Sequence, residues 1–183
     1  MTENIAVENC EASNGGGLGF HPGTGSVYTM MVNNVSHHND EDGIFLCWRV
    51  QHSVFRGNRS YANKRFGISI GHKDTDNLFE ENEIYENGRH GVTFRNENKQ
   101  NSGDRNTFVR NRIENNGTGG EEAYGFYVGG VTEGIVLKEN VIRASGAGNQ
   151  KAAVFVGQNA AEVQMEGNQV AGHPEVIRES PQP

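Results

Sequence analysis

The sequence is poor in cysteine and proline, and it contains no long hydrophobic run. It has 183 residues, of which two are cysteine and four are proline. Cys10 and Cys47 fall at different positions of the repeat described below, and neither belongs to a CxxC pair. This argues against a disulfide and against a zinc site built on sulfur. No stretch approaches the roughly 18 apolar residues of a membrane span, so we expect no membrane partner.

The apolar fraction is also low, at 34%, whereas glycine is abundant, with 25 residues. Such a composition would fill a large two-layer core with difficulty, but it suits a narrow core that is one coil wide. The N-terminus, MTENIAVEN, has neither a basic start nor an apolar stretch, so this chain shows no signal peptide. It leads directly into a strand-like segment, which we interpret as part of a longer precursor.

The net charge of −7 argues against nucleic acid as a partner. The charge is unevenly distributed, because residues 47–112 hold 12 of the 16 Lys and Arg but only 8 of the 23 Asp and Glu. This stretch therefore has a local net charge of +4, and the remainder of the chain has −11. The middle of the chain is the region that would attract an anion. The alternative is that these charges belong to an ordinary solvated surface.

A repeat of about 24 residues organises the sequence. Six units begin at a glycine or alanine, and the first and third residues after it are always apolar. This alternation predicts a strand with one buried face. The six units start at Gly17, Gly43, Gly67, Gly91, Gly125 and Ala153.

Each unit also contains an asparagine that follows an apolar or aromatic residue by three positions. The aromatic members are Phe55, Phe79 and Phe108, and we expect them to stack inside the molecule. Stacked asparagines can pass amide hydrogen bonds from one unit to the next. The asparagine column is Asn33, Asn58, Asn82, Asn111, Asn140 and Asn168.

These patterns predict an all-β fold, a right-handed parallel β-helix of about seven rungs with two or three short strands per rung. We expect residues 1–173 to form this domain and residues 174–183, which contain three prolines, to form a C-terminal tail. Polar insertions at 96–105, at 117–122 and in the first unit (HPGTGS) should lie in turns.

The recurring pattern N-x-[IV]…N-G…G-[IV]-x-[ILF], across about residues 4–173, resembles the parallel β-helix proteins of the pectate-lyase-like superfamily. That resemblance implies the fold and an association with polysaccharides, but no particular chemistry. A fainter similarity to the polygalacturonase family lies in Asp40–Gly43 and in Gly67–Gly71. The histidine that this family carries before the second motif is replaced here by 64–66, so we transfer no catalytic residue from it.

Functional side chains of a β-helix must occupy outward positions that align between rungs. We expect a lysine among other cations to have a lowered pKa and to remove the proton next to a sugar carboxylate. A neighbouring histidine would act as acid or base, and arginines would hold carboxylates. The candidate catalytic residues are Lys73, His72, Asp74 and Arg49, and the candidate substrate-binding residues are Arg95, Glu97, Trp48 and Asn96.

Small Gly71 should leave room for a ligand between Cys47 and Arg95. Asp74 and Glu97 would orient the basic groups or bind Ca²⁺ through oxygen, so a calcium cofactor stays open. The alternative is a set of surface salt bridges, Arg49–Asp74 and Lys73–Glu97, each of which contributes roughly 0–1 kcal/mol.

A second polar cluster precedes Gly43, and its histidines and carboxylates are of metal-binding types. No known ligand spacing supports a metal there, so we predict no metal site. The residues just before the unit starts, Asp42, His90 and Tyr124, should line a neighbouring ridge. The cluster comprises His37, His38, Asp40, Glu41 and Asp42.

Together these features predict a carbohydrate-active module that binds an acidic polysaccharide, with lyase or epimerase chemistry. One alternative is a non-catalytic segment of a longer protein, used for glycan binding, structure or adhesion. Another is a hydrolase of polygalacturonase type. We expect an extracellular or periplasmic location and leave end-on or side-by-side self-association open, since solenoid ends expose sheet edges.

Overall fold

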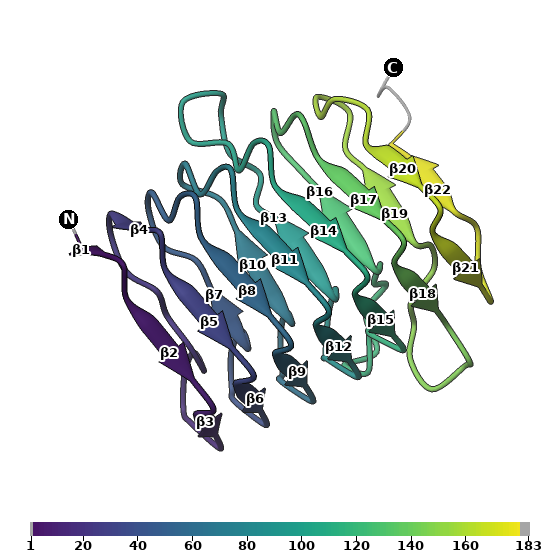
Figure 1. Cartoon of the computed structure of the whole chain (residues 1–183). Coiled ribbons are helices and arrows are strands. Elements are labelled where there is room, and N and C mark those ends of the chain that lie inside the picture. The colour runs from purple at the N-terminus through teal and green to yellow at the C-terminus, as the bar shows by residue number, and fades with distance from the viewer. Residues whose placement is uncertain (1, 180–183) are drawn as a thin grey trace.

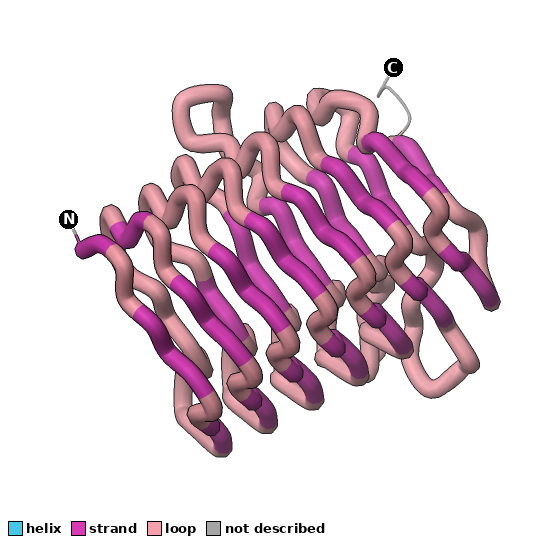
Figure 2. Tube along the Cα trace, in the orientation of Figure 1, coloured by secondary structure: helices cyan, strands magenta, loops and turns pink. Residues whose placement is uncertain are grey.

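The chain winds into a parallel β-solenoid in which every complete rung contributes three short strands (Figure 1). This computed structural model describes residues 2–179. Within that range the secondary structure is strands and turns without a helix, so no helix could cross a membrane. Figure 2 shows the strands as short segments separated by turns in each rung. The predicted all-β solenoid of about seven rungs is confirmed.

Three parallel sheets run along the solenoid. The first sheet consists of β7 (Ile44–Phe45), β10 (Ile68–Ile70), β13 (Val92–Phe94), β16 (Phe126–Val128), β19 (Val154–Val156) and β22 (Val176–Arg178). The second sheet consists of β2 (Ala6–Glu8), β5 (Met30–Val32), β8 (Val54–Arg56), β11 (Leu78–Glu80), β14 (Thr107–Val109), β17 (Val136–Lys138) and β20 (Gln164–Glu166).

The third sheet consists of β3 (Glu11–Ser13), β6 (Val35–His37), β9 (Arg59–Tyr61), β12 (Glu83–Tyr85), β15 (Arg112–Glu114), β18 (Val141–Arg143) and β21 (Gln169–Ala171). A separate pair, β1 (Thr2–Glu3) and β4 (Ser26–Val27), lies at the N-terminal end. The strands pair in register, so residues one rung apart in the sequence stack on one another.

The narrow core is built around the predicted phenylalanine column. Phe55, Phe79 and Phe108 are fully buried, with ring centroids 4.6 and 4.4 Å apart and nearly parallel ring planes. Phe94 and Phe126 pack edge-on against Phe108. The strand spacing of a sheet sets this distance, because each ring rises from the same position of a successive strand. The stacked aromatic column predicted from the sequence is therefore confirmed.

Asparagine ladders hold the turns together. The side-chain oxygen of Asn82 accepts both the backbone N–H and the side-chain amide of Asn58, and Asn111 does the same for Asn82. Buried turn amides obtain partners in this way. The sequence predicted one such column, but the structure has two further ones. They comprise Asn39, Asn63, Asn87 and Asn116, ending at Gln150, and Ser53, Asn77 and Asn106.

The register predicted for the first unit is wrong. The unit starts at Gly19, whose backbone N–H donates to Asp42, and its ladder residue is Asn34 rather than Asn33. Met31 therefore packs inside the solenoid, while Met30 is 44% exposed. Residues 30 and 31 are both methionine, and residues 33 and 34 are both asparagine, so two registers fit the sequence pattern equally well. A shift of one residue exchanges the two faces of a strand. The spacing from 19 to 43 is then 24, so the expected insertion in this unit does not exist.

The other insertions lie in turns, as predicted. Residues 96–105 connect β13 to β14 and project from the solenoid (Figure 1), and residues 117–122 connect β15 to β16. Within the predicted C-terminal tail, Val176–Arg178 forms β22 and pairs with β19. Residues 180–183 of that tail lie outside the described residues. The domain boundary at 173 stays a prediction.

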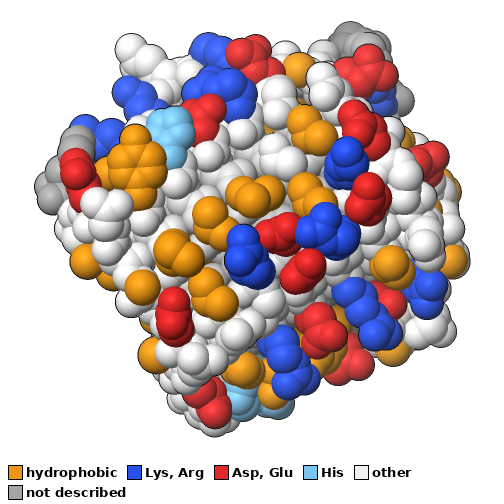
Figure 3. Space-filling model, viewed as in Figure 1, with side chains coloured by type: hydrophobic (Ala, Val, Ile, Leu, Met, Phe, Trp, Pro, Cys, Tyr) orange, Lys and Arg blue, Asp and Glu red, His pale blue; other side chains and the backbone are white. Residues whose placement is uncertain are grey.

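Much of the positive charge at 47–112 is paired with carboxylates on the outer faces. On the second sheet, Arg56 and Arg110 both contact Glu80, and the next rungs add Lys138 beside Glu166. Figure 3 shows lysine and arginine side chains next to aspartate and glutamate side chains on the visible face. Exposed pairs of this kind contribute little stability. The second sheet is therefore a mixed-charge surface, and an anion site must be sought elsewhere.

Candidate functional site

Four of the residues predicted as catalytic or substrate-binding form two stacked turns that lead from the first sheet to the second. Trp48, Arg49, His72 and Lys73 all have positive φ, between 50° and 67°. The Trp48 and His72 rings stack at 5.7 Å, and Arg49 donates its backbone N–H to the carbonyl of His72. Arg49 and Lys73 are exposed. A left-handed backbone conformation is unfavourable for residues other than glycine, so these turns require stabilising contacts from the residues packed beneath them.

Asp74 provides that support from a fully buried position. Its carboxylate accepts the backbone N–H groups of Val50, at 2.9 Å, and of Gly71, at 3.2 Å. Burial raises the pKa of Asp74 to about 7, although these donors and the guanidinium of Arg95 oppose the increase. Asp74 therefore holds the turn, and its carboxylate does not face solvent.

The ion pairs differ from the surface salt bridges that the sequence suggested, Arg49–Asp74 and Lys73–Glu97. Among residues 2–179, Asp74 contacts Arg95 at 3.4 Å rather than Arg49, and Glu97 contacts His72 at 2.8 Å rather than Lys73. Asp74 follows β10 and Glu97 follows β13, one rung further on, and the partner of each carboxylate comes from a different column of the repeat than expected.

Arg95 crosses two rungs instead of pointing straight outward. It donates to Ser69 Oγ at 2.9 Å and to the Leu46 carbonyl at 3.0 Å, and its guanidinium lies 4.4 Å from the centre of the Phe45 ring. A Cβ at Gly71 would lie 2.7 Å from Arg95 Nε. The space that we expected Gly71 to leave for a ligand is thus filled by Arg95, which corrects that prediction. Burial lowers the pKa of Arg95 from its ordinary value.

A groove runs across the first sheet beside this cluster, and its central hollow has a volume of about 350 Å³. The floor is formed by outward residues of successive strands, namely Phe45, Ser69, Thr93 and Tyr127. The rest of the lining comes from the residues that precede each strand and from those that follow β13. These are Asp42, Arg65, Phe66, His90, Arg95 and Asn96.

One wall of the groove is aromatic. The rings of Phe66 and His90 stack at 5.4 Å, those of His90 and Tyr127 at 4.9 Å, and those of Tyr127 and Phe155 at 5.3 Å. Burial lowers the pKa of His90 to about 4, so the ring is neutral at pH 7. Its Nδ1 accepts the backbone N–H of Tyr124 at 3.3 Å. The neutral ring then carries its proton on Nε2 and is a hydrogen-bond donor there.

Two guanidinium groups flank the hollow. Arg65 is partly exposed and lies 3.7 Å from the buried carboxylate of Asp42, whose pKa is raised by desolvation. Arg95 also lines the hollow, fixed by Ser69 and Leu46. The edges of these stacked rings, beside two positive charges, form a surface that can hold an anionic sugar ring. No group of three His, Cys, Asp or Glu among residues 2–179 is arranged to hold a metal ion.

Of the predicted site residues, the structure brings only Arg95 and Asn96 into the lining of the hollow. His72, Lys73, Asp74, Arg49, Trp48 and Glu97 are gathered on the adjoining turns. The sequence reasoning missed Arg65, Phe66 and Tyr127 as site residues. Two columns of the repeat contained this information: the residues just before each strand, and the outward residues in the middle of each strand. The prediction placed the two columns on separate ridges.

The sequence matches the family model described as a right handed beta helix region over residues 3–177, so the chain belongs to the right-handed β-helix family. The predicted handedness is thereby confirmed, and so is the resemblance to pectate-lyase-like proteins in fold. No curated protein matches the sequence.

Solved structures share the fold at low sequence identity. The A-module of the Azotobacter vinelandii mannuronan C-5 epimerase AlgE4 is 17% identical with a TM-score of 0.77, and the match covers 99% of this chain and 57% of that one. The periplasmic alginate epimerase AlgG is 18% identical with a TM-score of 0.68, over 98% and 46%. The Dettilon tailspike protein is 16% identical with a TM-score of 0.67, over 95% and 41%. The chain thus spans about half the length of these proteins, and the likeness concerns the fold alone.

Proposed function

We propose that this chain binds an acidic polysaccharide in the groove of the first sheet and acts on it as a lyase or an epimerase. The observation that carries the proposal is the hollow lined by a stack of aromatic rings and by two guanidinium groups, Arg65 and Arg95. Proteins with the same fold include two epimerases of acidic polysaccharides and a pectate lyase, which supports the same class of ligand.

The groove matches the two chemical features of a uronate residue. Its pyranose ring would lie along the edges of the His90 and Tyr127 rings, whose faces are covered by neighbouring rings, and its carboxylate would be held by a guanidinium. Arg65 is suited to this because its own carboxylate partner, Asp42, lies 3.7 Å away, beyond a good hydrogen bond. Arg95 would contribute positive charge from a fixed position.

Lyase and epimerase chemistry begin alike. A base removes the proton from the carbon next to the carboxylate, and positive charge stabilises the resulting enolate. In a lyase the glycosidic oxygen on the neighbouring carbon then leaves and takes up a proton. In an epimerase a proton returns to the same carbon from the opposite face. In the hollow, neutral His90 and the Tyr127 hydroxyl are hydrogen-bond donors that would stabilise the enolate, while Lys73 and His72, predicted from the sequence as base and acid, lie on the adjoining turn.

Variants distinguish these assignments. The chain would be incubated with mannuronan, alginate and polygalacturonate, with ultraviolet absorbance reporting unsaturated ends and proton NMR reporting inverted residues. Tyr127→Phe and His90→Gln should abolish product if the groove residues act, whereas Lys73→Ala should abolish it if the turn residues act. Thermal unfolding of each variant would show that the fold is retained.

Binding is tested separately by Arg65→Gln, which should weaken uronate binding roughly tenfold, as expected for a charge-assisted contact of about 1.4 kcal/mol. Arg56→Gln is the matched control, because Arg56 is an exposed arginine on the second sheet. Equal affinity of wild type and Arg65→Gln, or equal losses in both variants, would refute the groove as the binding site.

A second candidate is glycan binding without turnover, as part of a longer structural or adhesive protein. One observation favours it: His90 and Tyr127 are both arranged as donors, since His90 Nδ1 accepts a backbone N–H and the Tyr127 hydroxyl donates to Asn96. The hydrolase alternative finds no support in the hollow, where Asp42 is the only carboxylate among the lining residues. Inverting hydrolysis needs two carboxyl groups, about 6.5–9.5 Å apart.

A further inference from the structure

Two further hollows adjoin the groove of the first sheet, one at each of its edges. Because the strands are parallel, the residues that precede them form one edge and the residues that follow them form the other. The leading hollow, at the first edge, has a volume of about 490 Å³ and shares Arg65 with the groove. The trailing hollow, at the other edge, has about 310 Å³ and shares Asn96 with the groove.

The three hollows form one path across the sheet. Residues 90–96 lead from one edge to the other, which is roughly 15–20 Å at about 3.3 Å per residue of strand. This length exceeds a single sugar ring, so an oligosaccharide in the groove must also contact at least one of the flanking hollows. The chemistry of those hollows therefore decides which polymer fits.

The leading hollow is basic. Arg89 contacts Glu121 at 2.9 Å and Lys64 contacts Asp40 at 2.6 Å, and all four side chains are exposed. Exposed ion pairs are weak, so a ligand carboxylate can replace either acidic partner. The lining contains three cationic side chains and one carboxylate, namely Lys64, Arg65, Arg89 and Glu121.

The trailing hollow is lined by side-chain amides. Asn96 Oδ1 accepts the Gly130 N–H at 2.9 Å and Asn98 Oδ1 accepts the Gln100 N–H at 3.0 Å, while the NH₂ groups of both asparagines have no acceptor among residues 2–179. Free amide donors and acceptors match the hydroxyls of an uncharged sugar. The exposed amide residues of the lining are Asn96, Asn98, Gln158 and Asn159.

The trailing hollow also carries negative charge. Its lining contains Glu97 and Glu179 but no lysine or arginine. Glu97 contacts His72 at 2.8 Å, and Glu179 accepts the Gln158 N–H at 3.0 Å. A ligand carboxylate placed here would meet like charges and no guanidinium to hold it. The path thus changes from a basic end that attracts uronates to an amide-rich, acidic end that disfavours them.

We propose that the path selects a heteropolysaccharide in which an uncharged sugar stands next to uronate residues. The uronate carboxylates bind Arg65 and Arg89, and the uncharged sugar lies in the trailing hollow and exchanges hydrogen bonds with its amides. This inference rests on the proposed function, because it concerns the same groove, and it names the class of polymer that the groove prefers. A polymer of uronates alone binds less tightly, since it places a carboxylate beside Glu97.

Calorimetric titration with tetramers of galacturonate tests the proposal, because methyl esterification changes the charge while the rings and linkages stay the same. The probes are the free acid, the two isomers esterified on both residues of one end, and the fully esterified tetramer. One half-esterified isomer should bind two- to fivefold more tightly than the free acid, the range of an exposed charge interaction. This advantage should shrink in about 1 M salt, where the screening length is about 3 Å. The fully esterified tetramer should bind least tightly.

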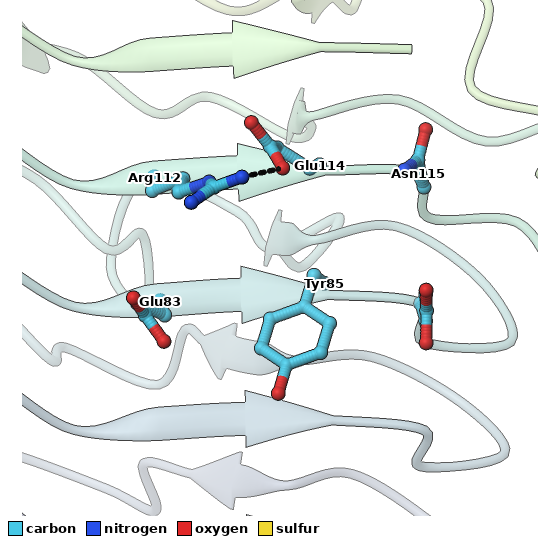
Figure 4. A pocket seen from close by; sticks show the side chains of 6 residues that line it. Glu83, Tyr85, Arg112, Glu114 and Asn115 are labelled. Atoms are coloured by element: carbon cyan, nitrogen blue, oxygen red, sulfur yellow. Dashed lines mark ion pairs between the residues drawn. The ribbon is translucent and has the colours of Figure 1, made fainter. Parts of the chain in front are cut away.

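Glu97→Gln should reduce the advantage by strengthening the binding of the free acid. Glu83→Gln is the matched control, because Figure 4 shows Glu83 in a separate hollow of the third sheet, beside Tyr85. It should leave the ratio of the affinities unchanged. Thermal unfolding reports whether each variant is folded.

The outcomes separate this inference from the proposed function. Binding of the free acid as tight as that of both half-esterified isomers, or the same ratio in folded Glu97→Gln as in wild type, would overturn the selection and leave an acid-binding groove in place. Equal binding of the fully esterified tetramer and the free acid would instead refute the role of the guanidinium groups, and the proposed function with it.

Discussion

The stability of this protein should depend on pH in opposite ways through Asp74 and His90. Replacing one of the two groups should therefore reveal the pH dependence that the other one causes. The pKa of Asp74 rises from its ordinary value of 3.8 to about 7 on folding. Between these values the folded state retains a proton that the unfolded chain has lost. The free energy of unfolding from this group is therefore greatest below pH 4 and falls as the pH rises toward 7.

His90 acts in the other direction. Burial lowers its pKa from 6.5 to about 4, so the unfolded chain binds a proton in this interval while the folded protein does not. Its contribution is complete above pH 6.5 and is lost as the pH falls toward 4. At about 1.4 kcal/mol per pKa unit, the upper values are about 4 kcal/mol for Asp74 and about 3 kcal/mol for His90. Relaxation of the surrounding groups on ionisation makes the measured changes smaller.

The assay is urea unfolding of wild type, Asp74→Asn and His90→Gln at intervals from pH 4 to pH 8. The difference between each variant and wild type is compared across pH, so that all other titrating groups cancel. Asp74→Asn should lose stability at every pH because its amide opposes the Gly71 N–H, but the loss should be smallest near pH 7. His90→Gln should show its smallest loss near pH 4. A profile of Asp74→Asn parallel to that of wild type would refute the reasoning and would mean that Asp74 is ionised throughout.

Three further predictions concern packing. Gly71→Ala should displace Arg95, with a loss of about 1–3 kcal/mol in unfolding free energy and weaker uronate binding; full retention of both would contradict the close approach. Phe79→Ala should cost about 3–5 kcal/mol by calorimetry, since the ring is fully buried between two others. Asn34→Ala should destabilise more than Asn33→Ala in urea titrations, by about 1–2 kcal/mol, because the Asn34 side chain accepts the Cys10 N–H and donates to the Val7 carbonyl and to Asn58 Oδ1; the opposite order would contradict the register.

The fold was predictable because the same spacing of glycine, apolar and asparagine residues occurs in several successive units. A single strand such as β10 is too short to be recognised, but apolar residues at the positions of Ile68 and Ile70 recur in successive units at the same distance from a glycine or alanine. The prediction failed where the first unit offered two equivalent registers, since Met30–Met31 and the following asparagine pair fit either one. The structure resolves it through hydrogen bonds across rungs, which a linear pattern does not contain.

The site was less predictable, for a reason that lies in side-chain length. Columns assign neighbours correctly for residues that stack directly from one rung to the next, and they brought Trp48 and His72 together as expected. Arg95 instead reaches a carbonyl 49 residues earlier in the chain, over two rungs, and occupies the space above Gly71. Long side chains choose partners by reach and by available acceptors. The repeat determines the backbone position of such a residue, but it does not determine where the charged end of its side chain lies.

The asparagine ladders give the solenoid a polarity. In each ladder the residue of the earlier rung donates and the residue of the later rung accepts, without reversal from Asn34 to Asn168. The amide dipoles therefore add along the axis and polarise one another. One end of the molecule offers acceptors to the next coil and the other offers donors. Two coils can continue the ladders when they meet head to tail, whereas two identical ends present donor to donor or acceptor to acceptor.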